Sequence, residues 1–211
     1  MDKRTGWALA GLGAAALLGV GAFMVAGEKG AERPKYRRIR RDGSVELRAY
    51  PELTLTETVV VATREEALGR GFQRLADYIF AKSRSGDPIA MTAPVLSEPA
   101  GEGGGWRTRF IMPSRYTLDD LPAPGVGIAL TMIPAREVAA IQFNGHADDA
   151  KLAAAEAELR AWLADRGYAA AGPAEHAFYN SPFMPGALRR NEVLIPLAQA
   201  EVMPGSSSAG D

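Results

Sequence analysis

The sequence predicts an α+β domain in which two duplicated ββαββ halves form one curved antiparallel sheet, or a distorted barrel, with two packed helices. Three observations predict this fold: an internal repeat, two helical segments that each carry one apolar stripe, and short strands in which apolar and polar residues alternate. A helix with a single apolar stripe lies across a sheet and is not buried on all sides. An N-terminal transmembrane helix is expected to precede the domain.

The internal repeat relates two pairs of strand-like segments. Residues 45–51 match residues 128–134, and residues 110–113 match residues 193–196, in their apolar pattern and in their closing proline. Both pairs have the same offset, because 134 − 51 and 196 − 113 each equal 83. Two matches at one offset favour a duplication in which each half runs strand, strand, helix, strand, strand.

The two helices are indicated by capping residues and by the spacing of apolar residues. Thr63 and Glu66 form a capping box ahead of the first helix. Its apolar stripe is Leu68, Phe72, Leu75 and Ile79. The second helix is predicted over about residues 148–166, with Gly167 as a natural C-cap. Its apolar stripe is Leu152, Leu159 and Leu163.

The other strands are predicted from alternation and from turn residues. The domain begins with a hairpin, with strands over 36–41 and 44–50 and a tight turn at Asp42-Gly43. A further strand is predicted over 89–95, after the first helix. Pro94 cannot donate a ladder hydrogen bond, so this strand is expected at an edge of the sheet or at a bulge.

The N-terminal residues are predicted to form a membrane segment. Thr5 to Gly27 is a run of 23 residues without a charge, and as a helix it would reach ~35 Å, enough to cross a bilayer. A cleaved signal sequence is the alternative, but the apolar core of a signal peptide usually has only ~7 to 15 residues. We therefore prefer an uncleaved single-pass anchor over residues 1–27.

Three further regions follow the anchor. Residues 28–35 are predicted to be a polar linker, residues 36–199 the folded domain, and residues 200–211 a disordered tail with nothing to bury. Basic residues flank the apolar run on both sides, so their count does not settle the side of the membrane. The extracytoplasmic (periplasmic) side is preferred.

The composition excludes several classes of function. The net charge is −1, so no excess of positive charge is left to follow a phosphate backbone, and no nucleic-acid partner is expected. The chain has no cysteine and only two histidines, which excludes disulfides, thiolate metal sites and a three-histidine zinc site. No residue pattern resembles an activated nucleophile or a metal cage. We therefore expect neither a metal site nor an enzyme.

Four motifs follow one another in a recognisable order. They are Ile89-Ala-Met-Thr-Ala-Pro-Val95, Trp106-Arg-Thr-Arg-Phe-Ile-Met-Pro113, Tyr179-Asn-Ser-Pro182 and Arg189-Arg-Asn-Glu-Val193. Together with the opening strand at 45–51, they resemble the motifs of the SOUL haem-binding protein family, over roughly residues 36–197. The resemblance implies a duplicated fold of this type and non-covalent binding of haem or another porphyrin.

A tetrapyrrole needs an apolar slot with cations at its mouth, because it is a flat apolar disc with two carboxylates on one edge. The first helix is predicted to supply both. Phe72, Leu75 and Ile79 would contact the ring, and Arg70 and Arg74 would face the carboxylates. The alternative is that the same apolar stripe faces the core of the domain, and both interpretations stay open.

Four residues outside the first helix complete the predicted site. Met91 would touch the porphyrin or ligate its iron, or else be packing in the core. Arg189, like the neighbouring Arg190, would pair with a carboxylate of the ligand or with Glu192 and nearby backbone. Phe183 would contact ligand or membrane from an apolar loop. Tyr179, at the base of that loop, would contact the ring or fill the core.

Neither histidine coincides with a motif of the family, so no axial ligand for iron is obvious. His146 and His176 are both predicted to be solvated turn residues, with axial ligation of iron as the alternative. The leading hypothesis is therefore a non-catalytic buffer or carrier of haem, or of a related tetrapyrrole, held at the membrane. The alternatives are a binding module for another apolar or amphipathic ligand and a protein-interaction module, and the sequence names no protein partner.

Overall fold

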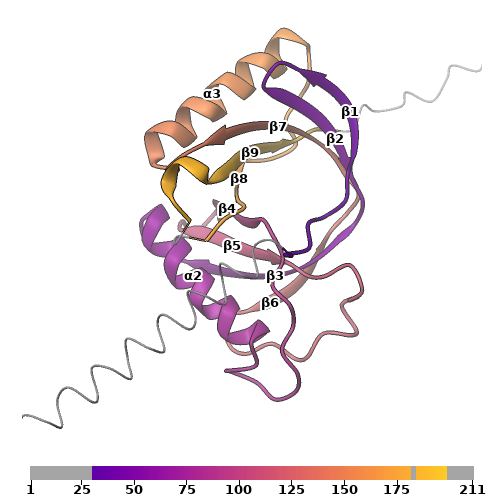
Figure 1. Cartoon of the computed structure of the whole chain (residues 1–211), viewed down its shortest axis with the longest axis vertical. Helices are drawn as coiled ribbons and strands as arrows, with labels where there is room; N and C mark the ends of the chain where they lie inside the picture. The colour runs from indigo at the N-terminus through magenta and orange to yellow at the C-terminus, as the bar shows by residue number, and fades with distance from the viewer. Residues whose placement is uncertain (1–29, 182–183, 199–211) are drawn as a thin grey trace, which may run out of the picture.

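The computed structural model describes residues 30–181 and 184–198, which form one antiparallel sheet of nine strands and two α-helices (Figure 1). The strands of the first half are β1 (Arg37–Asp42), β2 (Val45–Tyr50), β3 (Leu53–Val60), β4 (Val95–Pro99) and β5 (Trp106–Ile111). Those of the second half are β6 (Ala129–Ile133), β7 (Arg136–Asn144), β8 (Glu175–Phe178) and β9 (Arg190–Pro196). The helices are α2 (Arg64–Ile79) and α3 (Asp149–Asp165), and a 3-10 turn, η1 (Gly186–Leu188), precedes β9.

The order of the strands follows the predicted duplication. The order across the sheet is β1-β2-β7-β9-β8-β4-β5-β3-β6. Apart from β1, the two ends mirror each other: the first strand of each half pairs with the second strand of the other half, as β2 with β7 and β6 with β3. The halves meet in the middle, where β4 pairs with β8.

The two faces of the curved sheet carry separate apolar clusters. Both helices cover the outer face (Figure 1). There α3 packs on β7 and β9 of the second half, and on β2 beside them, through a cluster that includes Leu47 and Leu159. Helix α2 packs on the first half through a cluster that includes Leu75 and Phe110. Successive strand residues point to opposite faces, so the strands also supply a third cluster on the concave face. It includes Tyr50, Leu96, Ile111 and Leu194.

The N-terminal hairpin forms as predicted, with its turn one residue later. Asp42 still belongs to the ladder, so the two loop residues are Gly43 and Ser44. Gly43 has a φ of 58°, a conformation that glycine adopts without steric cost. The ladder of β1 also shifts register between Arg38 and Arg40, which marks a bulge.

Both helices lie where the sequence predicts them, but their caps differ. The side chain of Asp148 accepts a hydrogen bond from the Lys151 N–H (2.9 Å) and caps α3. Before α2 the predicted capping box is incomplete, because the Thr63 side chain makes no cap hydrogen bond to the backbone. Its hydroxyl donates to Glu66 Oε2 (3.0 Å) instead, so the two side chains bond each other.

The prediction of a strand over 89–95 is wrong in its start and in its place. β4 begins at Val95, and before it Thr92 makes only an isolated bridge. β4 pairs with β5 on one side and with β8 on the other, so it lies inside the sheet and not at an edge. Pro94 stands just before the first ladder residue, where no N–H is needed, and so it does not limit the position of the strand.

Several predicted regions fall outside the described residues. They include the apolar run Thr5–Gly27, Phe183 and the tail at 200–211. In the part of the chain that the structure describes, no helix is long and apolar enough to cross a membrane. Residues 31–35, predicted as linker, lie against the concave face of the sheet, where Figure 1 shows the start of the described chain in indigo.

Candidate functional site

The apolar residues predicted to contact a ring gather between α2 and the sheet. Leu75 and Ile79 are fully buried there, with 0% and 1% of their surface exposed. Phe72 is half-buried and meets Phe110 edge-on, with 5.2 Å between the ring centroids. Met91 is half-buried at the edge of the same cluster. Leu75 and Ile79 thus belong to the core, whereas Phe72 and Met91 reach the surface.

The cations predicted on α2 lie on the other margin of the helix from Phe72. Arg74 Nη1 donates to Thr58 Oγ1 on β3 (2.8 Å), whereas the Phe72 ring packs against Phe110 of β5. Arg70 is exposed one turn before Arg74, on the same margin. Two residues along a helix are about 200° apart, so a flat ligand on the Phe72 side faces away from both arginines.

Arg189 lies in a loop that meets the turn before α3. Arg189 Nε donates to the Met184 carbonyl (2.9 Å), and its Nη1 lies 3.5 Å from Nδ1 of His146, which is exposed as predicted. The same turn receives a hydrogen bond from Arg64, at the start of α2, to the Ala147 carbonyl (3.3 Å). The turn at 145–149 therefore brings the Arg189 loop close to the first residues of α2.

His176 is not the solvated turn residue that the sequence predicts. It lies in β8, is only 6% exposed, and its Nδ1 has no hydrogen-bond partner among the described residues. Its imidazole lies 5.7 Å from the ring of Trp106. Burial, together with the positive charge of Arg64, lowers the pKa of His176 to about 4, against the opposing charges of Glu156 and Asp149. Because these charges belong to both helices, the imidazole lies between α2 and α3.

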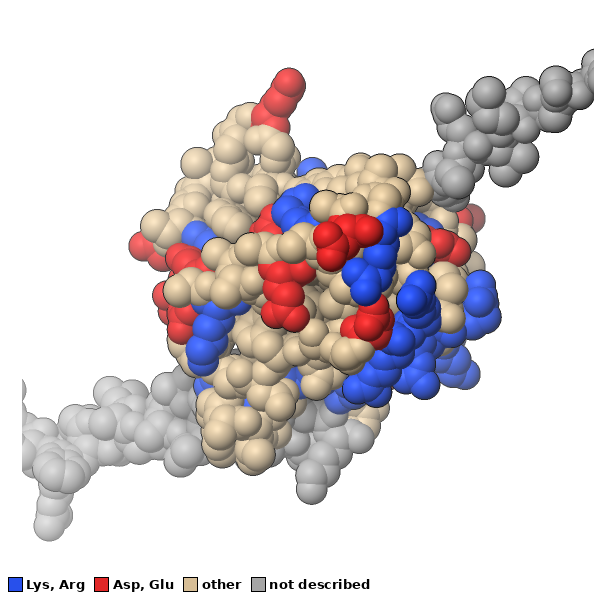
Figure 2. Space-filling view, turned by 90° about the horizontal axis from the view of Figure 1, so that it is seen from above, with Lys and Arg blue, Asp and Glu red and all other residues tan. Residues whose placement is uncertain are grey.

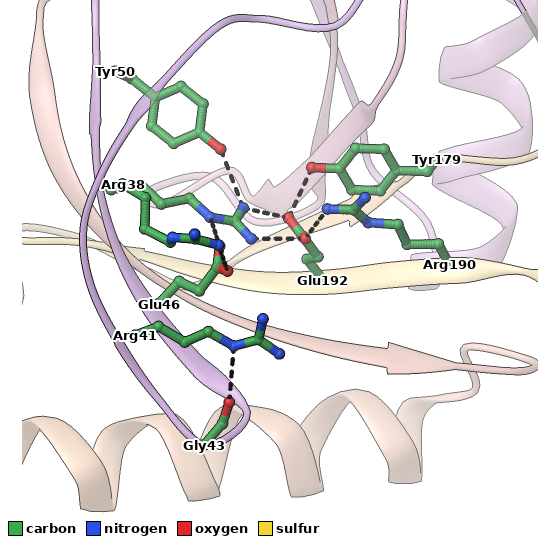
Figure 3. Close-up of polar contacts among 9 residues, drawn as sticks. Arg38, Arg41, Gly43, Glu46, Tyr50, Tyr179, Arg190 and Glu192 are labelled. Carbon is green, nitrogen blue, oxygen red and sulfur yellow. Dashed lines mark hydrogen bonds and ion pairs between the residues drawn. The ribbon is translucent and has the colours of Figure 1, made fainter.

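A buried network of charged and phenolic groups lies on the concave face (Figure 3). Glu192 of β9 has no exposed side-chain surface, and Arg48 of β2 donates to both its oxygens, Nη1 to Oε2 (2.7 Å) and Nη2 to Oε1 (3.0 Å). Arg190 donates to Oε1 (2.6 Å) and the Tyr179 hydroxyl to Oε2 (2.7 Å). The Tyr179 side chain therefore belongs to this network, which lies on the opposite face of the sheet from Phe72.

The network keeps fixed protonation states near neutral pH. Burial by itself would raise the pKa of Glu192, but hydrogen bonds from Arg48 and Arg190 outweigh burial and lower that pKa. Burial raises the pKa of Tyr50 to about 12. Burial also raises the pKa of Tyr179, and the carboxylate of Glu192 adds to the effect. The network joins β2 and β9 to Tyr179, the residue that follows β8, and none of these groups exchanges a proton near pH 7.

The segment Ala31–Tyr36 lies across the concave face and is held at its first turn by Glu32. The Glu32 carbonyl accepts a hydrogen bond from the Ala93 N–H (2.9 Å). Its Oε1 accepts one from the Ser114 N–H (2.8 Å), and this hydrogen bond lowers the pKa of Glu32. One carboxylate and one carbonyl therefore tie the segment to the loops that flank β4 and β5.

The rest of the segment rests on aromatic rings and leaves little space beneath it. The Arg33 guanidinium lies 5.4 Å from the ring centroid of Tyr179, and the ring of Tyr36 lies 5.1 Å from that of Tyr50. Beneath Pro34 an apolar cavity of about 10 Å³ remains, room for about one water molecule. It is lined by Tyr50, Leu53, Leu96, Ile111 and Leu194 among others.

A polar hollow of about 150 Å³ lies on the same face, beside the hairpin. It is lined by Arg41, Ser44, Glu46, Arg48 and Gln142. The carboxylate of Glu46 receives hydrogen bonds from Arg38 (3.2 Å) and Arg48 (2.9 Å), so it balances positive charge at the wall of the hollow (Figure 3). Within residues 30–181 and 184–198, no three acidic or histidine side chains gather as they would around a metal ion.

The sequence profile of the SOUL heme-binding protein family matches residues 31–196. The chain belongs to the SOUL heme-binding family. The match includes β1 to β9 and both helices, and it confirms the resemblance of the sequence motifs. No curated protein sequence matches this SOUL protein significantly.

Solved structures with the same fold come from proteins of remote sequence. The C-terminal domain of EcmrR has a TM-score of 0.58 and 14% identity, over 78% of this chain and 99% of that domain. A hydrolase from Listeria innocua has a TM-score of 0.52 and 10% identity, over 76% of this chain and 94% of the other. An uncharacterized conserved protein from Listeria innocua has a TM-score of 0.53 and 10% identity, over 74% and 92%. At such identities the likeness shows the fold alone.

Proposed function

We propose that this SOUL protein binds haem, or a related tetrapyrrole, non-covalently and acts as its buffer or carrier without catalysis. The observation that carries the proposal is the match of the family profile over residues 31–196. Bound haem would bring its own redox and ligand-binding chemistry, and the residues of the chain would bind and orient the disc.

The margin of α2 that faces α3 fits the apolar part of a disc best. Leu68 and Phe72 are half-buried there, one turn apart, and Met91 is half-buried at the edge of the same cluster. Arg189, near the start of this margin, is the predicted cation that suits a carboxylate. The concave face fits poorly, since a ligand pocket needs roughly 300 Å³ or more. The space beneath the segment Ala31–Tyr36 is about 10 Å³, and the hollow beside the hairpin is about 150 Å³ and polar.

Apolar contact has to supply most of the affinity, since we assign no axial ligand. Burying ~300 Å² of apolar surface at ~25 cal/mol/Å² yields about 7.5 kcal/mol before ordering costs, so binding is micromolar at best. An affinity in this range suits a carrier that must release its ligand.

A haemin titration of the full chain in mild detergent tests the proposal. We expect a saturable shift of the Soret band in the wild type. Phe72→Asp and Leu68→Asp should each abolish the shift, because a carboxylate on this margin repels the ring and its propionates. Circular dichroism checks that each variant is folded.

Two further variants serve as controls for the position of the ligand. Arg70→Glu changes the opposite margin of α2, and Val126→Asp changes a fully exposed apolar residue, so both should keep the wild-type titration. A wild type without a saturable shift would contradict haem binding. Equal potency of a lipid or an amphipathic cation as competitor would favour the alternative module for apolar ligands.

We further propose that residues 1–27 anchor the domain in a membrane, on its extracytoplasmic side. The support is the uncharged run from Thr5 to Gly27. Membrane fractionation followed by mass spectrometry of the N-terminus tests the anchor. An anchored chain stays with the membrane and keeps its first residues, whereas a chain that begins near Glu28 would mean a cleaved signal sequence.

A further inference from the structure

Positive charge is concentrated in and just before β1. Five of the seven residues 35–41 are lysine or arginine and none is acidic, although the whole chain has a net charge of −1. β1 is an edge strand, and residues 35–41 are all exposed. Figure 2 shows blue basic side chains gathered along one side of the molecule, the side on which β1 lies in Figure 1.

The bulge in β1 divides its arginines between the two faces of the sheet. Arg38 points to the concave face, where it donates to Glu46 (3.2 Å), and Arg41 lines the polar hollow on that face. An unbroken strand would place residues 38 and 41 on opposite faces, since side chains alternate. The extra residue at the bulge removes this difference, so both arginines lie beside the carboxylate of Glu46.

Among the described residues, the cations on the outer face form no ion pair, although Arg40 lies near Asp42 and Lys35 lies near Glu32. Arg40 stands opposite Leu47 in the ladder, and Leu47 belongs to the cluster under α3, so Arg40 points outward. Arg37 falls on the same face because of the bulge, and Lys35 follows by alternation. In the described part of the chain, Lys35, Arg37 and Arg40 make no hydrogen bond or ion pair through their side chains.

Aromatic side chains border this outer face at the end of β1. Asp42 accepts a hydrogen bond from Trp162 Nε1 (3.1 Å) and one from Arg166. Trp162 stacks on Tyr168, with 5.7 Å between centroids, and Tyr168 is 37% exposed. Tryptophan and tyrosine beside basic residues are typical of protein surfaces at a membrane interface.

We propose that the outer face of β1, with Lys35, Arg37 and Arg40, lies on an anionic lipid surface. The inference rests on the membrane anchor proposed above. Lys35 follows Gly27 by eight residues, so the anchor keeps this face within roughly 30 Å of the bilayer. Each cation near an anionic surface strengthens binding about five-fold, and the effect fades beyond a Debye length of ~8 Å. Because the anchor holds these charges close to the bilayer, we favour lipid over nucleic acid as their partner.

The absence of cysteine from the sequence allows a clean test with one reporter. The full chain carrying Ile39→Cys is labelled with an environment-sensitive fluorophore and placed in nanodiscs of phosphatidylcholine, with or without phosphatidylglycerol. We expect the fluorophore to be quenched by spin-labelled lipid in the anionic discs only. Raising the salt concentration should reverse the quenching, since salt screens exposed charges.

Neighbouring arginines on opposite faces provide the matched comparison. Arg40→Glu should reduce the quenching several-fold, whereas Arg41→Glu should change it little. Equal quenching in both lipids, equal effects of the two variants, or release of the fluorophore from lipid by an added oligonucleotide would overturn the inference.

Co-elution of the chain with the discs measures the anchor separately. If the chain does not co-elute, the anchor is wrong, and co-sedimentation of the same variants with phosphatidylglycerol vesicles then tests the surface by itself. Binding that Arg40→Glu weakens and Arg41→Glu does not would support the lipid surface even then. Binding that neither variant changes would refute it.

Discussion

His176 shows how the fold selects one protonation state of a residue. Its imidazole is buried between α2 and α3, and its Nδ1 finds no partner among the described residues. Desolvation penalises the charged form of such a group more than the neutral form. The folded chain therefore holds His176 neutral at a pH where an exposed histidine begins to bind a proton.

We predict that His176 makes the protein less stable as the pH falls from about 6.5 to about 4. The pKa is lowered to about 4 in the folded state, so in this range the unfolded chain binds the proton and the folded chain does not. The loss of unfolding free energy is about 3 kcal/mol at most.

Urea denaturation across this pH range measures the loss of unfolding free energy. His176→Phe should flatten the dependence, whereas a His146→Asn control should keep the wild-type slope; equal slopes for His176→Phe and wild type would contradict the prediction.

Charged residues within strands could be interpreted only in part from the sequence. Arg189 and Arg190 were both expected to pair with ligand carboxylates or with Glu192. Arg190 does bond Glu192, because residues two apart share a face of a strand, whereas Arg189 donates to the Met184 carbonyl. The period of a strand is enough to distinguish the two arginines. The stronger partner, Arg48, was beyond prediction, since it lies on β2, and β2 reaches β9 only through β7 of the other half.

At the level of elements, α2 approaches the sheet closely because of one glycine. A Cβ atom at Gly71 would lie 2.5 Å from Thr108 Oγ1 and 2.9 Å from Thr108 Cβ, closer than real contacts allow. Gly69, in the same helix, would place a Cβ in open space. The sequence predicted the helix and its apolar stripe correctly. It could not tell which part of the stripe touches the sheet closely and which part stays half-exposed at Phe72.

We predict opposite effects for alanine at these two glycines. Gly71→Ala should lower the unfolding free energy by about 1 to 3 kcal/mol, because the helix must move away from Thr108. Gly69→Ala should raise it by up to about 1 kcal/mol, because alanine is the better helix former and meets nothing. Denaturant unfolding of both variants measures the two changes. A loss of stability in Gly69→Ala as large as in Gly71→Ala would contradict the close approach.

At the scale of the whole molecule, the internal repeat could be predicted from the sequence. The pairing of the first strand of each half with the second strand of the other half could not. The common offset of 83 residues relates β2 to β6 and β5 to β9, as the sequence predicted. Alternation shows which residues of a strand share a face, but it does not show which strand lies next to it. The pairing of β2 with β7 and of β6 with β3 therefore came from the structure alone.

The segment Ala31–Tyr36 closes the concave face, and we predict that Glu32 controls how firmly it does so. Glu32→Ala removes the acceptor for the Ser114 N–H, so the segment should leave the face more often. The Ala93 amide, which donates to the Glu32 carbonyl, should then exchange its hydrogen roughly three-fold to ten-fold faster.

Hydrogen exchange with mass spectrometry of peptides that contain Ala93 measures the effect of Glu32→Ala. Lys35→Ala is the control, because Lys35 acts on Glu32 only through its charge and makes no side-chain hydrogen bond in the described part of the chain. An unchanged exchange rate at Ala93 in Glu32→Ala would mean that the ring contacts of Arg33 and Tyr36 hold the segment without the carboxylate.

The pairing of strands between the two halves also affects how the chain folds during its synthesis on the ribosome. When β2 has emerged, its neighbour β7 lies more than eighty residues further along the sequence and has yet to be synthesised. Until then β2 can pair only with the exposed β1, and its apolar side chains stay uncovered until α3 has been synthesised as well. The nascent protein therefore cannot close its sheet while it is being made, and its last assembly step falls after the second copy of the repeat is complete.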